Sequence, residues 1–386
     1  MLLTAVSALL LSSLSACDGG GPTAKPEQAG PTSSTRDRLL IVGQDLGAIR
    51  GYLDSHCCPP PDGLTAYVDF YDILQPGDFG GLGIDTDGKD AGFDFDWGSG
   101  PINAWRTATE FGIDRLAIGL SITENEHPGK LERLGNGEFD AEIRQLGRFM
   151  NLIEGPVYLR IGYEFDGAWN QGYENTQRYI GAWQRIVDVL RQTGIDNVEF
   201  VWQASASTTD DVIDGRHEDI TQWYPGDAYV DWMAVSWFLQ PRETVEVAGT
   251  FVPLTPLELT EEVLDFARQR GKPVMIAEAA PQGIDLRERF MANHSPIWDG
   301  PAGEGRKAMS DDEIWAHWFA PLFELLDDNR DVLYALAYIN VDWDSQAMWG
   351  PPYSSGFWGD SRLEVNAEIA RRFGEAVEAW KHVDDD

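Results

Sequence analysis

The sequence predicts an α/β fold, a single (β/α)8 TIM barrel, from three observations. Eight short apolar runs, of the kind that form strands covered on both faces, alternate with longer segments of helical periodicity. Glycines stand where helix C-caps belong, directly before a following strand. The alternation spans about 350 residues without a visible internal repeat, within the usual range of such barrels. We therefore expect one barrel domain over residues 38–386.

The expected strands are dominated by aliphatic, β-branched and aromatic residues. In chain order they are Leu39–Val42, Ala66–Tyr71, Arg115–Leu120, Val157–Gly162, Val198–Gln203, Trp232–Phe238, Pro273–Ala277 and Leu333–Asn340. The amphipathic patterns between them predict helices at Glu138–Ile153, Asn175–Thr193, Pro256–Arg270 and Ser310–Asp328. Gly194 and Gly271 would end the second and third of these helices.

The first 17 residues, MLLTAVSALLLSSLSAC, predict a lipoprotein signal peptide. The apolar run is too short to span a bilayer. Leu14-Ser15-Ala16-Cys17 resembles a bacterial lipobox, in which Cys17 would be lipidated and become the first residue of the mature protein. The usual basic residues before the apolar run are missing, so an ordinary secretion signal with an incidental Cys17 stays open. Residues 18–37, rich in Gly, Pro, Ser and Thr, predict a flexible linker.

The chain carries a formal net charge of −35, and 43% of its residues are hydrophobic, enough for a sizeable core. Since nucleic acids and anionic lipid surfaces are bound by Lys and Arg, the charge argues against both as partners. We expect a monomer in the bacterial cell envelope, with the lipid anchor as its only contact with a membrane; the side of the membrane stays open.

The cysteines and the acidic loop leave alternatives open. Cys57 and Cys58 are expected to be two structural thiols or a strained vicinal disulfide in the loop after the first strand. Neither their spacing nor nearby histidines suggests zinc. The Asp-rich loop 85–96 faintly resembles a calcium loop, but it lacks the D-x-D-x-D-G order and the terminal Glu. The sequence therefore predicts no metal, with calcium in this loop as the alternative.

Two of the expected strands lead to a glutamate. Glu164 follows one strand within RIGYEFDGAW, and Glu278 ends another within KPVMIAEAAP. The C-terminal ends of barrel strands meet at one mouth, where the two carboxyl groups are expected to converge. Two such groups are the minimum for cleaving a glycosidic bond, one as proton donor and one as nucleophile or base. Glu164 and Glu278 are therefore the expected catalytic residues, and the residues alone do not assign the two roles.

Other polar and aromatic residues belong to the same predicted mouth. Tryptophan rings stack on the apolar faces of sugars, and polar groups bind the sugar hydroxyls. The residues that we expect to bind substrate are Gln44, Arg160, Tyr163, Trp169, Trp202, Trp237 and Trp343. Arg160 is also expected to favour ionised carboxylates and to hold the one that acts as nucleophile.

Several segments resemble glycoside hydrolase family 26, in the right order over roughly residues 38–345. Arg160-x-x-Tyr163-Glu164-x-Asp166-Gly167-x-Trp169 resembles the family's strand-four signature, R-x-x-H-E-x-N-G-x-W. The other matching segments are Gly43-Gln44, Val201-Trp202, Trp223–Trp232, and Lys272-Pro273 with Glu278. The resemblance implies a retaining enzyme of the barrel clan that needs no cofactor, with Glu164 as acid/base and Glu278 as nucleophile.

Three positions depart from the family pattern. Tyr163 replaces the histidine before the acid/base, and Gly119-Leu120-Ser121 stands where Ser-Trp-His is often found. The family's tyrosine that hydrogen-bonds the nucleophile is replaced by Trp237 or Phe238. Since these positions contact the sugar next to the scissile bond in the family, we expect a specificity other than for its common substrate, β-mannan.

Together these features predict a secreted, lipid-anchored, retaining glycoside hydrolase that cleaves within a β-linked polysaccharide. The expected partner is thus a polysaccharide or oligosaccharide. The alternatives are a catalytically inactive, carbohydrate-binding surface lipoprotein on the same barrel, and a β-mannanase proper. Another enzyme class on this fold, a lyase or an esterase, is disfavoured because no G-x-S-x-G elbow is present. The sugar, the linkage and the choice between endo and exo cleavage stay open.

Overall fold

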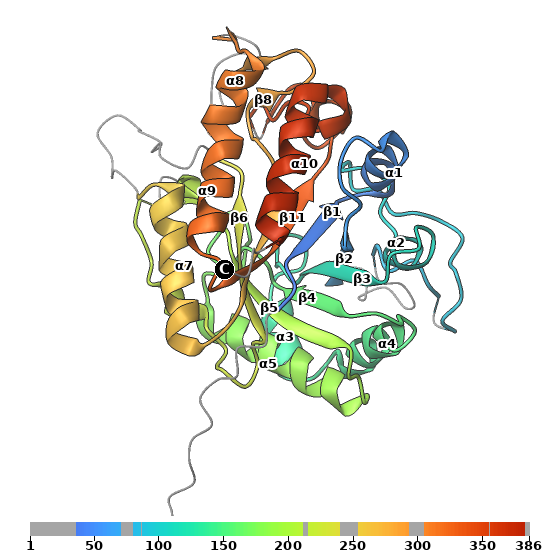
Figure 1. Cartoon of the computed structure of the whole chain (residues 1–386). Helices are drawn as coiled ribbons and strands as arrows, with labels where there is room; N and C mark the ends of the chain where they lie inside the picture. Colours follow the sequence, from blue (N-terminus) through green and yellow to red (C-terminus); the bar gives the residue numbers. More distant parts are fainter. Residues whose placement is uncertain are drawn as a thin grey trace, which may run out of the picture. The chain divides into compact units, whose positions relative to one another are not determined.

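The computed structural model contains a closed barrel of eight parallel strands in the order β1-β11-β7-β6-β5-β4-β3-β2 (Figure 1). They are β1 (Leu39–Gly43), β2 (Gly63–Asp69), β3 (Arg115–Ser121), β4 (Val157–Ile161), β5 (Val198–Ala204), β6 (Trp232–Trp237), β7 (Val274–Ala279) and β11 (Leu333–Ile339). The predicted TIM barrel is thus confirmed. Seven of the eight expected strands agree with the observed bounds within two residues, whereas the second begins at Gly63 rather than at Ala66.

The structure describes residues 36–70, 80–85, 87–210, 215–239, 254–292, 305–354 and 356–382. The described residues from Asp37 onward belong to one compact unit that contains the whole barrel. The expected signal peptide, Cys17 and nearly all of the expected linker lie outside the described residues. Within the described part of the chain, no helix has both the length and the apolar character needed to cross a membrane.

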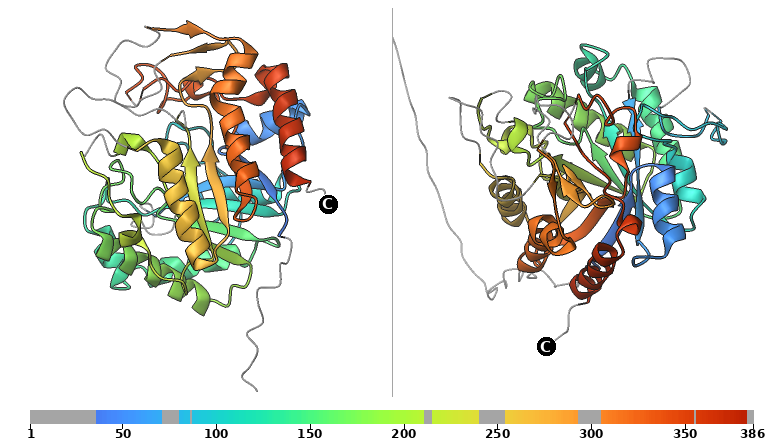
Figure 2. Two further views of the ribbon diagram at one scale, coloured as in Figure 1. Left: turned by 60° about the vertical axis from the view of Figure 1, so that its left-hand side comes forward. Right: turned by 90° about the horizontal axis from the view of Figure 1, so that it is seen from above.

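Helices surround the barrel, and the views of Figure 2 show α7, α9 and α10 following one another along its outside. The helices are α1 (Leu46–Ser55), α2 (Ala104–Thr109), α3 (Lys130–Gly135), α4 (Asp140–Met150), α5 (Thr176–Gln192), α7 (Pro256–Arg270), α8 (Asp311–Ile314), α9 (Ala320–Asp328) and α10 (Ala367–Lys381). Short 3-10 turns are η2 (Ile220–Trp223), η4 (Trp343–Ser345) and η5 (Leu363–Val365). A small antiparallel sheet combines β8 (Ile284–Asp285), β9 (Phe290–Met291) and β10 (Lys307–Ala308).

Local signals explain why some helices match their predicted bounds. Helix α7 begins with a capping box between Thr255 and Glu258 and ends at Gly271, whose φ of 63° is left-handed. The predicted helix Ser310–Asp328 also starts with a capping box, but it contains a π-helical turn, η3 (Trp315–Phe319), between α8 and α9. Helices α1, α2, α3 and α10 were not among the predicted helices.

Two apolar layers follow from strand alternation. The barrel interior is filled by one layer, which consists of Leu39, Ile41, Ala117, Tyr158, Val201, Trp232, Ala234, Met275, Ala277, Ala335 and Ala337. The larger layer lies between the strands and the helices and includes Trp183, Trp202 and Phe373. Successive side chains of a strand therefore point alternately to the interior and to the helices, which determines the residues that reach the barrel mouth.

The structure describes the two cysteines and most of the acidic loop. Cys57 and Cys58 are free thiols whose sulfur atoms lie 3.0 Å apart, and they follow helix α1 rather than the first strand directly. In the acidic loop, Asp85, Asp90 and Asp96 accept hydrogen bonds from nearby backbone amides. Among the described residues, no group of three or more His, Cys, Asp or Glu side chains is arranged to hold a metal ion.

Candidate active site

The structure brings Glu164 and Glu278 into one hydrogen-bonded network at the C-terminal ends of the strands. Ser236 Oγ donates to Glu164 Oε1 at 2.7 Å. Gln203 Nε2 donates to Ser236 Oγ at 3.0 Å and to Glu278 Oε1 at 3.3 Å. The side chains of β5 and β6 thus link the acidic residue that follows β4 to the one on β7, which confirms that the two glutamates converge.

Glu278 points into the barrel because β7 contains a bulge. Val235 of β6 pairs with Ile276, but the next residue, Ser236, pairs with Glu278, so Ala277 is skipped. Ala277 packs in the barrel interior, and Glu278 also reaches inward. In a regular strand the two would point to opposite faces, and bulges commonly re-aim a side chain next to an active site.

Arg160 forms an ion pair with Glu278. Its Nη1 atom lies 2.5 Å from Glu278 Oε1 and 3.0 Å from Gln203 Oε1. The Arg160 side chain is fully buried and does not line the cleft, so the expectation that it contacts substrate is wrong. A permanently charged guanidinium in contact with a carboxylate favours the ionised form. Arg160 therefore positions Glu278 through a buried ion pair.

Glu164 has the opposite environment, that of a proton donor. Burial, with a contribution from the negative charge of Glu278, raises the pKa of Glu164 to about 8. Its backbone adopts a left-handed φ of 53°, which is uncommon for a residue with a side chain. Asn170 Nδ2 donates to the Glu164 carbonyl at 2.8 Å, and Trp169 Nε1 donates to Oε2 at 3.1 Å. The loop after β4 thus holds a carboxyl group whose raised pKa suits it to donate a proton.

Both glutamates line a cleft of about 440 Å³. Of the residues expected to bind substrate, Gln44, Tyr163, Trp169 and Trp343 line it. The cleft also contains residues that sequence reasoning did not single out for it: Tyr67, Asp69, Asn170, Ser205, Thr209, Gln282 and Met348. Tyr67 and Asp69 lie at the C-terminal end of β2, so an accurate prediction of that strand's end would have identified both.

Trp202 and Trp237 do not line the cleft, and their assignment as substrate-binding residues is wrong. Both are buried in the layer between strands and helices, where Trp202 stacks on Phe165 with ring centroids 4.2 Å apart. Strand alternation is the reason, because Gln203 and Ser236, each adjacent to one of these tryptophans, point into the barrel instead. Proximity to a strand end does not by itself bring a side chain into the mouth.

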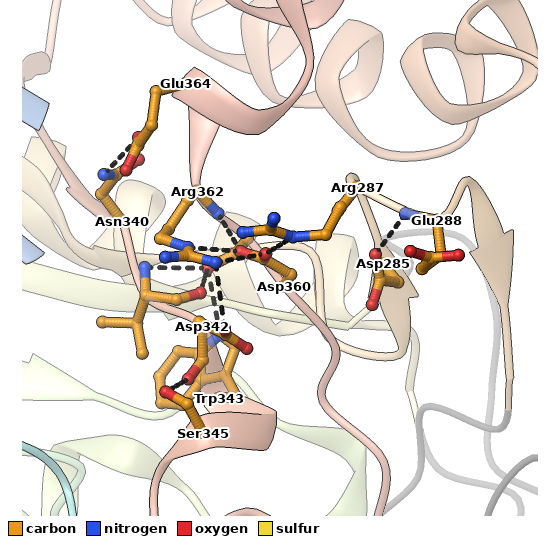
Figure 3. A network of polar contacts seen from close by, with 12 residues as sticks. Asp285, Arg287, Glu288, Asn340, Asp342, Trp343, Ser345, Asp360, Arg362 and Glu364 are labelled. Carbon is orange, nitrogen blue, oxygen red and sulfur yellow. Dashed lines mark hydrogen bonds and ion pairs between the residues drawn. The ribbon is translucent and has the colours of Figure 1, made fainter. Parts of the chain in front are cut away.

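Trp343 is held in the cleft by the network shown in Figure 3. Arg362 binds Asp342 at 2.9 Å and Asp360 at 2.7 Å, and thereby joins the segment after β11 to a later one. The indole of Trp343 donates to Ser361 Oγ at 3.0 Å. The position of Trp343 in the cleft is therefore stabilised by the ion pairs of Arg362 and by the buried hydroxyl group of Ser361.

The raised pKa of Glu164 predicts how activity depends on pH. If Glu164 must donate a proton, kcat/KM of the wild-type protein falls as pH rises through about 8. The hydrogen bond from Ser236 lowers the pKa of Glu164, so Ser236→Ala should move this basic limb to higher pH. The matched control is Ser99→Ala, a cleft residue without a hydrogen bond to either glutamate among the described residues. Rate profiles between pH 5 and 10 test this, and an unmoved limb in Ser236→Ala would contradict it.

The sequence profile and the curated relatives that match this chain are all glycoside hydrolases. The sequence profile described as "Glycosyl hydrolase family 26" matches residues 121–285. "Beta-1,3-xylanase TXYA" from Vibrio sp is 31% identical over 346 residues, which make up 89% of this chain and 65% of that protein. "Beta-1,3-xylanase" from Alcaligenes sp is 30% identical over 346 residues, which make up 89% of this chain and 64% of that protein. The chain thus spans just under two thirds of the length of these curated relatives.

Solved structures share the fold. The catalytic domain of an endo-β-1,4-mannanase from Bacillus sp. JAMB-750 superposes with a TM-score of 0.51 and 15% identity, covering 90% of each chain. A β-mannanase from Bacteroides ovatus superposes with a TM-score of 0.50 and 11% identity, covering 91% of this chain and 94% of that one. The profile match places residues 121–285, which include Glu164 and Glu278, in glycoside hydrolase family 26, and the motifs around both glutamates agree with this assignment.

Proposed function

We propose that this chain is a retaining endo-β-glycanase. The observation that carries the proposal is the unequal pair of carboxyl groups: Glu278 is ion-paired with Arg160, and Glu164 has a pKa raised to about 8. One carboxylate ready to attack and one carboxylic acid ready to donate are what retaining hydrolysis requires.

The two steps follow from this geometry. Glu278 attacks the anomeric carbon while Glu164 protonates the departing glycosidic oxygen, which leaves a glycosyl-enzyme ester on Glu278. Glu164, now ionised, takes a proton from water, and the water displaces Glu278 from the sugar. Proton NMR of the first-formed product tests the stereochemistry: retention of the β-anomer is expected, and the α-anomer would contradict a covalent intermediate.

We propose β-1,3-xylan as the preferred substrate. Both long relatives are named β-1,3-xylanases, and this chain has Tyr163 and Gly119 where family-26 enzymes commonly carry His and Ser. Tyrosine is bulkier than histidine and offers a single hydroxyl in place of an imidazole, so a sugar with another hydroxyl pattern should fit.

A panel of substrates tests this specificity. We expect kcat/KM on β-1,3-xylan to exceed that on β-1,4-mannan by about 100-fold or more, because a mismatched polar contact is costly in a buried subsite. The panel should include β-1,4-xylan and mixed-linkage glucan. Mannan as the best substrate would show that the substitutions do not control specificity, and binding without turnover on every glycan would favour the inactive carbohydrate-binding protein.

We also propose that the mature protein is anchored in the bacterial cell envelope through lipid on Cys17. The support is the Leu14–Cys17 segment and the linker-like composition that follows it. One acyl chain binds a membrane only weakly, so stable anchoring requires several chains. Mass spectrometry of the mature N-terminus should find lipidated Cys17 as its first residue. A product that begins elsewhere and carries no lipid would contradict the anchor.

A further inference from the structure

Tyr67, Gly119 and Arg160 form a row across three adjacent strands of the barrel. Tyr67 of β2 is in register with Gly119 of β3, and Gly119 is in register with Arg160 of β4. Since Gly119 has no side chain, Tyr67 and Arg160 meet over it. A Cβ atom at Gly119 would lie 2.7 Å from Cδ1 of Tyr67 and 2.9 Å from Nη2 of Arg160. Close approach, rather than backbone conformation, is therefore the reason for a glycine at this position.

The tyrosine ring belongs to the group of side chains around the nucleophile. The Cζ atom of Arg160 lies 5.1 Å from the Tyr67 ring centroid and 5.4 Å from that of Tyr163. The two tyrosine rings contact edge to face with centroids 5.6 Å apart. The same guanidinium binds Glu278, so the two phenol rings flank the cation that holds this carboxylate.

The hydroxyl group of Tyr67 is buried, and the guanidinium of Arg160 is the polar group of the described protein that interacts with its oxygen. Tyr67 lines the cleft that contains both glutamates. Burial, followed by the negative charge of Glu278, raises the pKa of Tyr67, so its phenol is neutral and able to donate. Arginine can only donate, so it satisfies the phenol oxygen and leaves the phenol proton without an acceptor. Buried polar groups in native proteins are nearly always hydrogen-bonded, which points to a ligand oxygen as the acceptor of this proton.

We propose that Tyr67 determines specificity by hydrogen-bonding the hydroxyl on carbon 2 of the sugar in the subsite just before the scissile bond. This inference rests on the proposed function. Glu278 must face the anomeric carbon, and carbon 2 is bonded to that carbon. Its hydroxyl therefore comes close to the groups packed around Glu278, and bonds to this hydroxyl strengthen in the transition state. The 2-hydroxyl is equatorial in xylose and glucose but axial in mannose. One donor in a fixed position can therefore distinguish an equatorial from an axial 2-hydroxyl.

The test compares two substrates and two proteins. The substrates are an aryl β-xylobioside and its analogue that lacks the 2-hydroxyl on the sugar bearing the aryl group. Tyr67→Phe should lower kcat/KM on the parent about tenfold or more, and change that on the 2-deoxy analogue by less than about twofold. An equal loss on both substrates would overturn the proposal, because a general disturbance of the site does not depend on one hydroxyl.

Controls separate this inference from packing and from the proposed activity. Tyr158→Phe changes a tyrosine of the barrel interior outside the cleft and should leave the ratio between the two substrates as in the wild type. Gly119→Ala should lower kcat on both substrates, since the added methyl displaces Arg160 as well as Tyr67. Full activity of Gly119→Ala would contradict the packing described here.

Calorimetry of xylobioside binding, with Glu278→Gln added to each of these proteins to stop hydrolysis, provides a readout without turnover. The same pattern is expected: Tyr67→Phe weakens binding of the parent glycoside and leaves binding of the analogue unchanged. A wild-type protein that binds but does not hydrolyse would refute the proposed enzyme and leave the Tyr67 contact supported. Equal weakening with both glycosides would refute the contact whether or not the protein is an enzyme.

Discussion

Glu278→Ala is expected to lower kcat on the natural polysaccharide on the order of 10⁴-fold or more, because no other group can form the glycosyl-enzyme ester. Azide should restore part of the activity on an activated aryl glycoside. The small anion fits the space left by the carboxylate and attacks the anomeric carbon directly, which gives a glycosyl azide of inverted configuration. Product analysis by NMR identifies this compound.

The matched control for this experiment is Glu278→Gln. The amide fills the space of the carboxylate, so the variant should be equally inactive but should not respond to azide. Both variants leave Arg160 buried without its anionic partner, which costs stability, and thermal unfolding must confirm that they remain folded. Near-normal turnover by folded Glu278→Ala would show that another residue is the nucleophile.

Glu164→Ala should have an effect that depends on the leaving group. On the polysaccharide, kcat/KM should fall about 10²- to 10⁴-fold, since the departing sugar oxygen then leaves without a proton. On an aryl glycoside whose phenol leaves readily as an anion, the first step should be nearly unaffected, and the glycosyl-enzyme should accumulate. A pre-steady-state burst of phenol measures this accumulation.

Two further observations distinguish loss of the acid from general damage. The basic limb of the kcat/KM profile near pH 8, which we assign to Glu164, should disappear in Glu164→Ala. Asn170→Ala serves as a comparison, because it removes the bond to the Glu164 carbonyl but retains the carboxyl group. That variant should be slower on all substrates and keep the basic limb. A uniform loss on both substrate types in Glu164→Ala would argue against its role as acid/base.

The hydrophobic pattern predicted most of the barrel because buried parallel strands read as continuous apolar runs, independently of what they pair with. Helix α7 was bounded correctly, since its capping box and its final glycine are local signals. The start of the second strand was misplaced because the strand begins with Gly63, and glycine is a weak strand former. In the structure Gly63 nevertheless pairs in register with Arg115 of β3. The predicted strand also ended at Tyr71 instead of Asp69, and this error at its end concealed Tyr67 at the mouth of the barrel.

The order of strands and helices and the two glutamates near strand ends were predictable, because they depend on local composition and on the common direction of the strands. Which side chains face the barrel interior became known only from the assembled barrel. The bulge at Ala277 turns Glu278 into the barrel, and strict alternation turns Trp202 and Trp237 away from it. Likewise, only the register of three strands showed that Gly119 leaves room for Tyr67 beside Arg160. The direction in which a side chain points and the register of the strands both depend on pairing between residues far apart in the chain, and a local sequence pattern does not predict that pairing.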